Sequence, residues 1–302
     1  MEVDIYKKYK TRQPQSKKQK EVYKPNNEYN LGSFLDKNDV VVCAIAKHED
    51  EYLEEWTKWY FDLGFDKIVL FDDNEDKTIV PSIPKIKEYV DNGKMKIIYC
   101  GNISIDYIQM RMYENFYNNN SFAWCAFFDI DEFLVLKKHN NIREYLSEPM
   151  FSKYGSIAIS WEVYGDNGIL TKEEGNVVDR FKVPAENRPI EEHVKKIIRG
   201  NLGKIRFPNP HMLECTKKNL CCNERGDTVR HNFYRMKTSY EYAKLNHYIT
   251  KSAEEFINKM LRGRAAQKVG VKRTLDSYFS TNPKTEDRVK ALNHFLEMHN
   301  NA

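Results

Sequence analysis

Short apolar runs alternate with amphipathic segments over the first half of the chain. Residues 40–46 form a continuous apolar run, rich in β-branched residues, which suits a strand buried on both faces. The next segment has its large apolar residues at helical spacings of three and four: Leu53, Trp56, Tyr60 and Leu63. Gly64 is a plausible end for that helix. Residues 67–71 are apolar again and predict a second strand, which ends in Asp72 and Asp73.

The same alternation then repeats. A helix containing Ile83, Ile86 and Tyr89 is followed by a strand at 95–100 and by a helix at about 105–118. Residues 124–128 predict a fourth strand, which stops at Asp129-Ile130-Asp131. Strands that alternate with helices predict a Rossmann-like α/β fold, with a mostly parallel sheet and helices on both faces.

The pattern becomes less regular after about residue 150. Residues 156–161 and 195–199 read as strands within a loop-rich region, and Ser252 with Glu255 forms a capping-box signal for a helix over 252–261. A last amphipathic helix carries Val289, Leu292 and Leu296. We therefore expect a flexible tail over 1–35, a main domain over 36–265 and a C-terminal helical extension over 266–302.

Charge is unevenly distributed along the chain. The net charge is +4, but residues 1–24 alone carry +5, so the remainder is nearly neutral at −1. A folded domain without a basic face is a poor candidate for nucleic-acid binding, and no nucleic-acid partner is expected. The basic tail is interpreted as a solvated arm, with peripheral contact to an anionic membrane surface as the alternative.

Cysteines and apolar runs indicate the compartment. The six cysteines show no zinc-finger spacing, and Cys43 and Cys125 lie in apolar strands as small buried side chains. The sequence has no apolar run of 18 residues and no signal-peptide pattern. These features predict a cytoplasmic protein, with the inner face of the membrane as a possible location because of the tail.

Acidic residues follow two of the predicted strands directly. In open α/β sheets the carboxyl ends of parallel strands form the ligand-binding edge, so the ends at residues 47–49, 72–74 and 129–131 should meet there. Asp129 and Asp131 are two apart, and paired carboxylates suit Mg²⁺ or Mn²⁺ bound to a diphosphate. A solvated acidic turn is the alternative, but apolar residues flank the motif on both sides.

The motifs taken together resemble glycosyltransferase family 92 and related bacterial glycosyltransferases of the GT-A, family 2-like type. The resemblance spans about residues 38–265 and rests on five stretches: 46–56, 71–74, 124–133, 161–168 and 246–263. One departure is His48, where the family usually has Asn.

This resemblance implies a GT-A-type fold and a metal-dependent enzyme. The implied reaction moves a hexose, with galactose as one candidate, from a nucleotide-sugar donor of the UDP type to a glycan or glycolipid acceptor. Inversion at the anomeric carbon and a place in capsule or lipopolysaccharide synthesis are also expected. A nucleotidyltransferase, or a non-catalytic carbohydrate-binding protein on the same scaffold, is the alternative, although the sequence has no Gly-rich phosphate loop.

The resemblance also assigns roles to single residues. Asp129 and Asp131 would hold Mn²⁺ or Mg²⁺, with His247 or its competitor His211 as a further ligand. Nucleotide and diphosphate contacts are expected from these residues: Lys47, Glu49, Asp72, Asp73, Gln109, Arg111, Asp129, Lys196 and Lys251. An inverting transfer needs a general base for the acceptor hydroxyl, and Asp166 is the first candidate with Glu162 as the alternative.

Overall fold

A computed structural model describes residues 30–185, 190–217, 220–229, 236–263 and 273–301. The predicted basic tail lies outside the described residues up to position 29, and the described chain starts with a short 3-10 turn, η3 (Gly32–Phe34).

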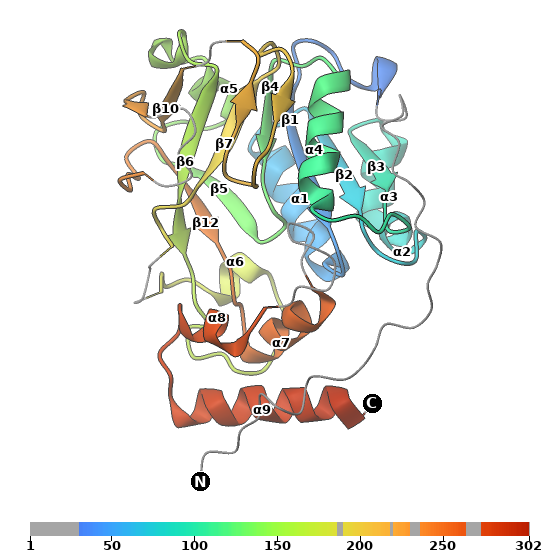
Figure 1. The fold of residues 1–302 in the computed structure, drawn as a ribbon, viewed down its shortest axis with the longest axis vertical. Helices are drawn as coiled ribbons and strands as arrows, with labels where there is room; N and C mark the ends of the chain where they lie inside the picture. The colour runs from blue at the N-terminus through green and yellow to red at the C-terminus, as the bar shows by residue number, and fades with distance from the viewer. Residues whose placement is uncertain (1–29, 186–189, 218–219, 230–235, 264–272, 302) are drawn as a thin grey trace.

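The first half of the chain forms the predicted α/β layers (Figure 1). Four parallel strands lie in the order β3-β2-β1-β4, and their bounds are β1 Val40–Ala46, β2 Lys67–Asp72, β3 Met95–Tyr99 and β4 Trp124–Phe127. Helices α1 (Leu53–Asp62), α3 (Pro84–Asp91) and α4 (Ile108–Asn119) connect them. These elements agree with the predicted ones to within a few residues.

The second half extends the same sheet. β7 (Val194–Arg199) lies antiparallel between β4 and β6 (Ser156–Val163), so β6 runs in the same direction as the first four strands. Beside β6, β12 (Ala243–His247) pairs in parallel, and β5 (Glu132–Leu136) pairs antiparallel with β12. The predicted fold class, a mostly parallel sheet flanked by helices, is confirmed. β5 and β12 were not predicted as strands.

The remaining described elements are short. They are η4 Asp50–Tyr52, α2 Ile79–Ser82, α5 Ile142–Leu146, η5 Pro149–Phe151, α6 Val177–Arg180, β8 Ile205–Arg206, β9 Glu214–Cys215, β10 Cys221–Asn223, β11 Thr228–Val229 and α8 Leu275–Phe279. β10 and β11 continue the sheet beyond β6, whereas β8 and β9 form a separate pair.

The core lies on both faces of the central sheet. Along β1, alternate residues point to opposite faces: Val40, Val42, Ala44 and Ala46 pack in one apolar cluster, and Val41, Cys43 and Ile45 pack in the other. All seven are buried, which confirms the prediction of a strand covered on both sides.

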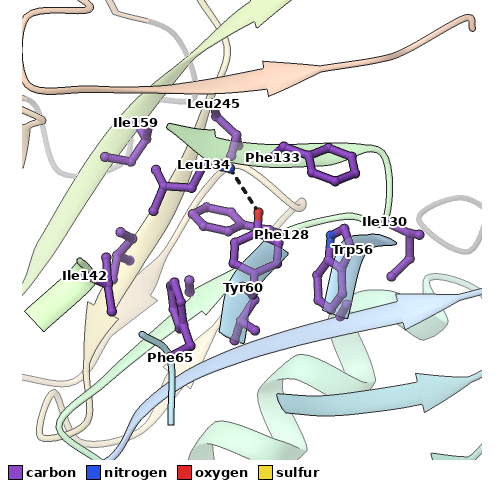
Figure 2. Close-up of a cluster of buried hydrophobic side chains, with 14 of the residues drawn as sticks. Trp56, Tyr60, Phe65, Phe128, Ile130, Phe133, Leu134, Ile142, Ile159 and Leu245 are labelled. Atoms are coloured by element: carbon purple, nitrogen blue, oxygen red, sulfur yellow. Dashed lines mark hydrogen bonds between the residues drawn. The ribbon is translucent and has the colours of Figure 1, made fainter. Parts of the chain in front are cut away.

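Helix α1 fixes the chain that follows β4. Tyr60 packs beside Phe128 and Leu134, and its hydroxyl accepts a hydrogen bond from Leu134 N at 3.3 Å (Figure 2). Trp56 Nε1 donates to the carbonyl oxygen of Asp129 at 3.0 Å. The large buried rings of α1 therefore hold in place the turn that carries the Asp-Ile-Asp motif.

The C-terminal helices pack together against the main domain. α7 (Ala253–Arg262) starts with the predicted capping box, and α9 (Glu286–Asn301) lies outside α7 and α8 (Figure 1). Their apolar contact is built from these buried residues: Phe256, Ile257, Tyr278, Leu292 and Leu296. α8 and α9 lie within the region predicted as a helical extension. In the part of the chain that the structure describes, no helix combines the length and the apolar character needed to cross a bilayer.

Candidate active site

The ends of β1 and β2 meet as the sequence predicts. Asp72 pairs with Ala46 in the parallel ladder, and Asp73 N donates to the carbonyl oxygen of Ala46 at 2.8 Å. Lys47 Nζ lies 3.4 Å from the carboxylate of Asp73 and 3.2 Å from its carbonyl oxygen. This edge therefore brings the predicted nucleotide residues of two strands into contact.

His48 occupies a special backbone position between these strand ends. Its φ is +47°, in the left-handed region, where Asn and His are tolerated better than most residues. Its N–H donates to Asn74 Oδ1 at 2.7 Å, and the Asn74 amide donates to Asp50 at 2.7 Å. The departure from Asn at this position thus keeps a residue type that the backbone accepts.

Asp72 has an unused acceptor in a buried position. One of its oxygens accepts from Asn74 N at 3.1 Å, while Oδ2 has no hydrogen-bond partner among the described residues. Burial raises the pKa of Asp72 to about 6, and it also raises the pKa of Asp73 in spite of Lys47. A donor group on a ligand would satisfy the free oxygen of Asp72.

Asp129 and Asp131 lie in the turn between β4 and β5, each with its own partners. Asp129, with its side chain 33% exposed, is 2.9 Å from Lys195 Nζ and accepts from Gln109 Nε2 at 2.7 Å. Asp131 is buried, contacts Lys259 Nζ, and lies 3.6 Å from His247 Nε2. Burial acts to raise the pKa of Asp131, but the charges of Lys259 and His247 outweigh it and hold it well below its usual value.

Three other cationic side chains lie near the Lys259 ammonium that contacts Asp131; we call Lys251, Lys259, Arg262 and Arg273 the cation cluster. Lys259 Nζ also donates to the carbonyl oxygen of Ile249 at 2.7 Å, and Arg262 is 2.5 Å from Glu49. Burial lowers the pKa of Lys259 to about 7, against the opposing charge of Asp131. The ammonium of Lys251 is buried over the ring of Tyr52 at 4.1 Å and makes no ion pair with a described residue.

The side chains around Asp131 include groups that could bind a divalent cation. No group of three or more His, Cys, Asp or Glu side chains in the described ranges is already arranged around a metal position. Asp131 Oδ2 and His247 Nε2 are nevertheless a hard oxygen and an imidazole nitrogen 3.6 Å apart, which one Mn²⁺ could contact together. Their chemistry fits such an ion, with phosphate oxygens and water needed for its other positions.

His211, the competing metal ligand, is used differently. Its Nδ1 faces the carbonyl oxygen of Val194 at 3.0 Å, and burial lowers its pKa to about 3. Its ring packs against Trp161, as do the rings of His193 and His247, with centroid distances of 5.0, 5.4 and 4.1 Å. His211 forms no ion pair with a carboxylate of the described residues, so the geometry favours His247 as the ligand.

Asp166 is enclosed by contacts from the C-terminal helices. Arg288 donates to both of its oxygens, at 2.6 and 2.7 Å, and Tyr278 OH donates to one of them. Burial acts to raise the pKa of Asp166, but these hydrogen bonds outweigh it and lower the pKa. With both oxygens occupied and the side chain buried, this arrangement favours a structural role over the predicted role as general base.

Glu162, the alternative base, faces away from Asp131. It contacts Lys244 Nζ and accepts from Tyr164 OH at 2.8 Å, whereas its neighbour Trp161 packs on His247. Successive residues of a strand point to opposite faces, which explains this separation. Glu162 is therefore paired on the far face of the sheet in this arrangement.

Two predicted nucleotide residues lie away from the Asp-Ile-Asp turn. Arg111 is an exposed residue of α4 and lies 3.9 Å from Glu114, while Gln109 on the same helix reaches Asp129. On β7 the structure places Lys195, and not Lys196, beside Asp129. The two lysines are adjacent, so strand alternation points their side chains to opposite faces of the sheet. The sequence of β7 alone does not show which of the two faces Asp129.

One family model covers most of the chain. The family model for glycosyltransferase family 92 matches residues 38–281, most of the chain, and the chain belongs to this family. It is therefore a glycosyltransferase, as the resemblance predicts. The search of curated proteins found no match.

Solved structures that match the chain do so at low identity and low TM-score. The Staphylococcus aureus protein TarS is 14% identical with a TM-score of 0.40, over 86% of this chain and 43% of TarS. TarS 1-349 in complex with UDP is 14% identical with a TM-score of 0.39, over 86% and 71%. The mannosyltransferase PcManGT of Pyrobaculum calidifontis, solved with GDP-Man and Mn²⁺, is 10% identical with a TM-score of 0.31, over 42% and 36%. The chain spans less than half the length of full TarS.

Proposed function

We propose that this glycosyltransferase moves a hexose from a UDP-sugar donor to a glycan or glycolipid acceptor in surface polysaccharide synthesis. The observation that carries the proposal is the pairing of Asp131 with His247, beside the cation cluster. A carboxylate and an imidazole for a divalent ion thus lie with buried ammonium groups for a diphosphate at the carboxyl edge of the parallel strands.

The nucleotide would lie across the ends of β1 and β2. Asp72 has a free buried oxygen, which can accept from a ribose hydroxyl or from the N–H of a base. Asp73 and Lys47 form the neighbouring wall. Glu49, two residues after Lys47, pairs with Arg262 of the cation cluster, so the proposed diphosphate position would follow the nucleotide position along the chain.

Mn²⁺ or Mg²⁺ would be held by Asp131 and His247, with Asp129 on the exposed side of the turn. When bound, the ion would neutralise charge that develops on the departing diphosphate. Lys251 is the best candidate for a direct phosphate contact, because its buried ammonium faces no carboxylate within ion-pair distance in the described residues. Lys259 is the second candidate.

The acceptor contact and the cellular location of the enzyme are two further parts of this proposal. The ring of Trp161 packs with His193, His211 and His247 in one aromatic cluster, and such rings suit the apolar faces of sugars. We place the enzyme in the cytoplasm, with the basic N-terminal tail as a contact for the inner face of the membrane. That tail lies outside the described residues.

A binding panel tests the proposal. We expect UDP with Mn²⁺ to raise the melting temperature more than GDP, CMP or dTDP do, and more than UDP without metal. UDP-galactose should then be hydrolysed slowly to UDP, and Asp131→Ala should reduce this release by about 100-fold or more while remaining folded. If no nucleotide stabilises the protein with or without Mn²⁺, the proposal fails.

A further inference from the structure

Lys259 lies where a metal ion bound to Asp131 would lie. Its ammonium contacts Asp131 Oδ2, the same oxygen that is 3.6 Å from His247 Nε2. The carbonyl oxygen of Ile249, 2.7 Å away, is its second partner. Both side chains of the ion pair are nearly buried, with 5% of Lys259 and 6% of Asp131 exposed.

An ammonium and a divalent ion cannot share this oxygen at low cost. Like charges a few ångströms apart repel strongly where water is excluded. The ion pair itself resists opening, because a buried carboxylate without a partner is unfavourable. For Asp131 Oδ2 to hold a metal ion, the Lys259 ammonium would therefore have to move away from that oxygen.

The rest of the cation cluster adds to this barrier. Lys251, Arg262 and Arg273 all lie close enough to act on the charge of Lys259. Of these, Arg262 is paired with Glu49, and Lys251 has no ion-pair partner among the described residues. The region is thus already cationic, which would oppose a bare divalent ion, whereas a nucleoside diphosphate bound with the ion would bring compensating negative charge.

We propose that Lys259 is the resident cation of the Asp131–His247 site, and that a divalent ion enters only by displacing it, which the diphosphate assists. This inference rests on the proposed function, since it assigns an order to its ligands: free metal binds weakly, and metal with nucleotide binds well. The displaced ammonium is then available to a phosphate oxygen. Lys259 is thus a positioning residue that makes metal binding depend on the donor.

The test measures Mn²⁺ binding directly, by loss of the free Mn²⁺ signal in electron paramagnetic resonance. Wild type is expected to bind free Mn²⁺ weakly and Mn²⁺ with UDP well. Lys259→Met removes the charge at similar length, and it should bind free Mn²⁺ at least about tenfold more tightly than wild type. Adding UDP should then improve Mn²⁺ binding less than it does in wild type.

Two further variants separate an effect on Mn²⁺ binding from a general loss of folding. Lys259→Gln removes the charge but keeps a donor for Ile249, and it should show the same gain in Mn²⁺ affinity. Arg288→Met is the matched control, because it breaks another ion pair to a buried carboxylate without touching Asp131. It should leave Mn²⁺ affinity unchanged. Melting temperatures should follow: Mn²⁺ should stabilise Lys259→Met more than wild type.

The outcomes separate this inference from the proposed function. If Lys259→Met and Lys259→Gln bind free Mn²⁺ no better than wild type, while UDP with Mn²⁺ still binds wild type, the resident-cation role is wrong and the transferase proposal stands. If wild type binds no UDP in any condition, the proposed function fails, and a gain of Mn²⁺ affinity in the variants still supports the displacement. Asp131→Asn should abolish that gain.

Discussion

Arg288 of α9 donates two hydrogen bonds to Asp166, from Nε at 2.6 Å and from Nη2 at 2.7 Å. The contact joins the last helix of the chain to the loop that follows β6. The family match ends at residue 281, so Arg288 lies beyond it. A residue outside the matched region therefore neutralises the carboxylate that the sequence marks as the first candidate base.

This contact predicts a loss of stability when either partner is removed. Arg288→Met leaves a buried carboxylate without its main partner, and the free energy of unfolding should fall by about 3–5 kcal/mol. Asp166→Asn should also destabilise, and the double variant should lose less than the sum of the two. Urea unfolding of the three variants measures this coupling.

The same variants decide between a structural and a catalytic role for Asp166. A structural role predicts that Asp166→Asn retains UDP and Mn²⁺ binding and loses activity only in proportion to its folded fraction. If Asp166→Asn is as stable as wild type but transfers no sugar, Asp166 is the base and the Arg288 contact must open during the reaction.

Asp72 predicts a pH dependence of nucleotide binding. Burial raises its pKa to about 6, so the ionised form that accepts a hydrogen bond is lost as the pH falls through 6. The affinity for UDP should then fall by about tenfold for each pH unit below 6. Calorimetry between pH 5 and 8 measures it, and a flat profile in wild type would contradict the assigned contact.

The Asp72→Asn variant gives an independent check through stability. A carboxyl group with a raised pKa in the folded state stabilises the fold most below its unfolded pKa, near 4, and that contribution is lost as the pH rises through 6. Relative to wild type, Asp72→Asn should therefore be more stable at pH 8 than at pH 5. Its UDP affinity should be weaker at pH 8 and nearly independent of pH.

Lys195 and Lys196 are a matched pair of residues for testing which face of β7 contributes to the binding of UDP with Mn²⁺. Lys195 is buried beside Asp129 and Glu132, so Lys195→Met should cost about 3 kcal/mol and weaken the binding of UDP with Mn²⁺. Lys196→Met, on the other face, should leave that binding unchanged. Titration of both variants with UDP and Mn²⁺ compares them, and a larger loss in Lys196→Met would overturn the assignment.

A side chain at Gly101 is expected to disturb the segment that carries Asp72 and Asp73. A Cβ at this position would lie 1.6 Å from the carbonyl oxygen of Asn74, so backbone must move to accept it. Gly101→Ala should destabilise the fold by about 1–3 kcal/mol and weaken UDP binding, because the displaced segment carries Asp72 and Asp73. Gly93→Ala is a suitable comparison, since its Cβ meets no atom within 4 Å, although its φ of +71° adds some strain.

The sequence by itself determined the layered part of the fold. Residues 40–46 are apolar at every position, and only a strand covered on both faces buries all of them, so β1 could be read without tertiary information. The helix spacing of Trp56 and Tyr60 gave α1, and the carboxyl-edge rule correctly brought Lys47 beside Asp73. Such local periodicity is a property of neighbouring residues, and a single chain displays it.

Tertiary structure alone decided how the charges pair. The pairing of β12 with β5 sets His247 opposite Glu132 and so beside Asp131, and α7 brings in Lys259 from 128 positions away. No pattern along the chain specifies which of two adjacent lysines on β7 faces Asp129, or that Arg288 reaches Asp166. Each of these contacts depends on strand register and helix docking, because an ion pair is set by position in space, whereas sequence spacing fixes position only within one element.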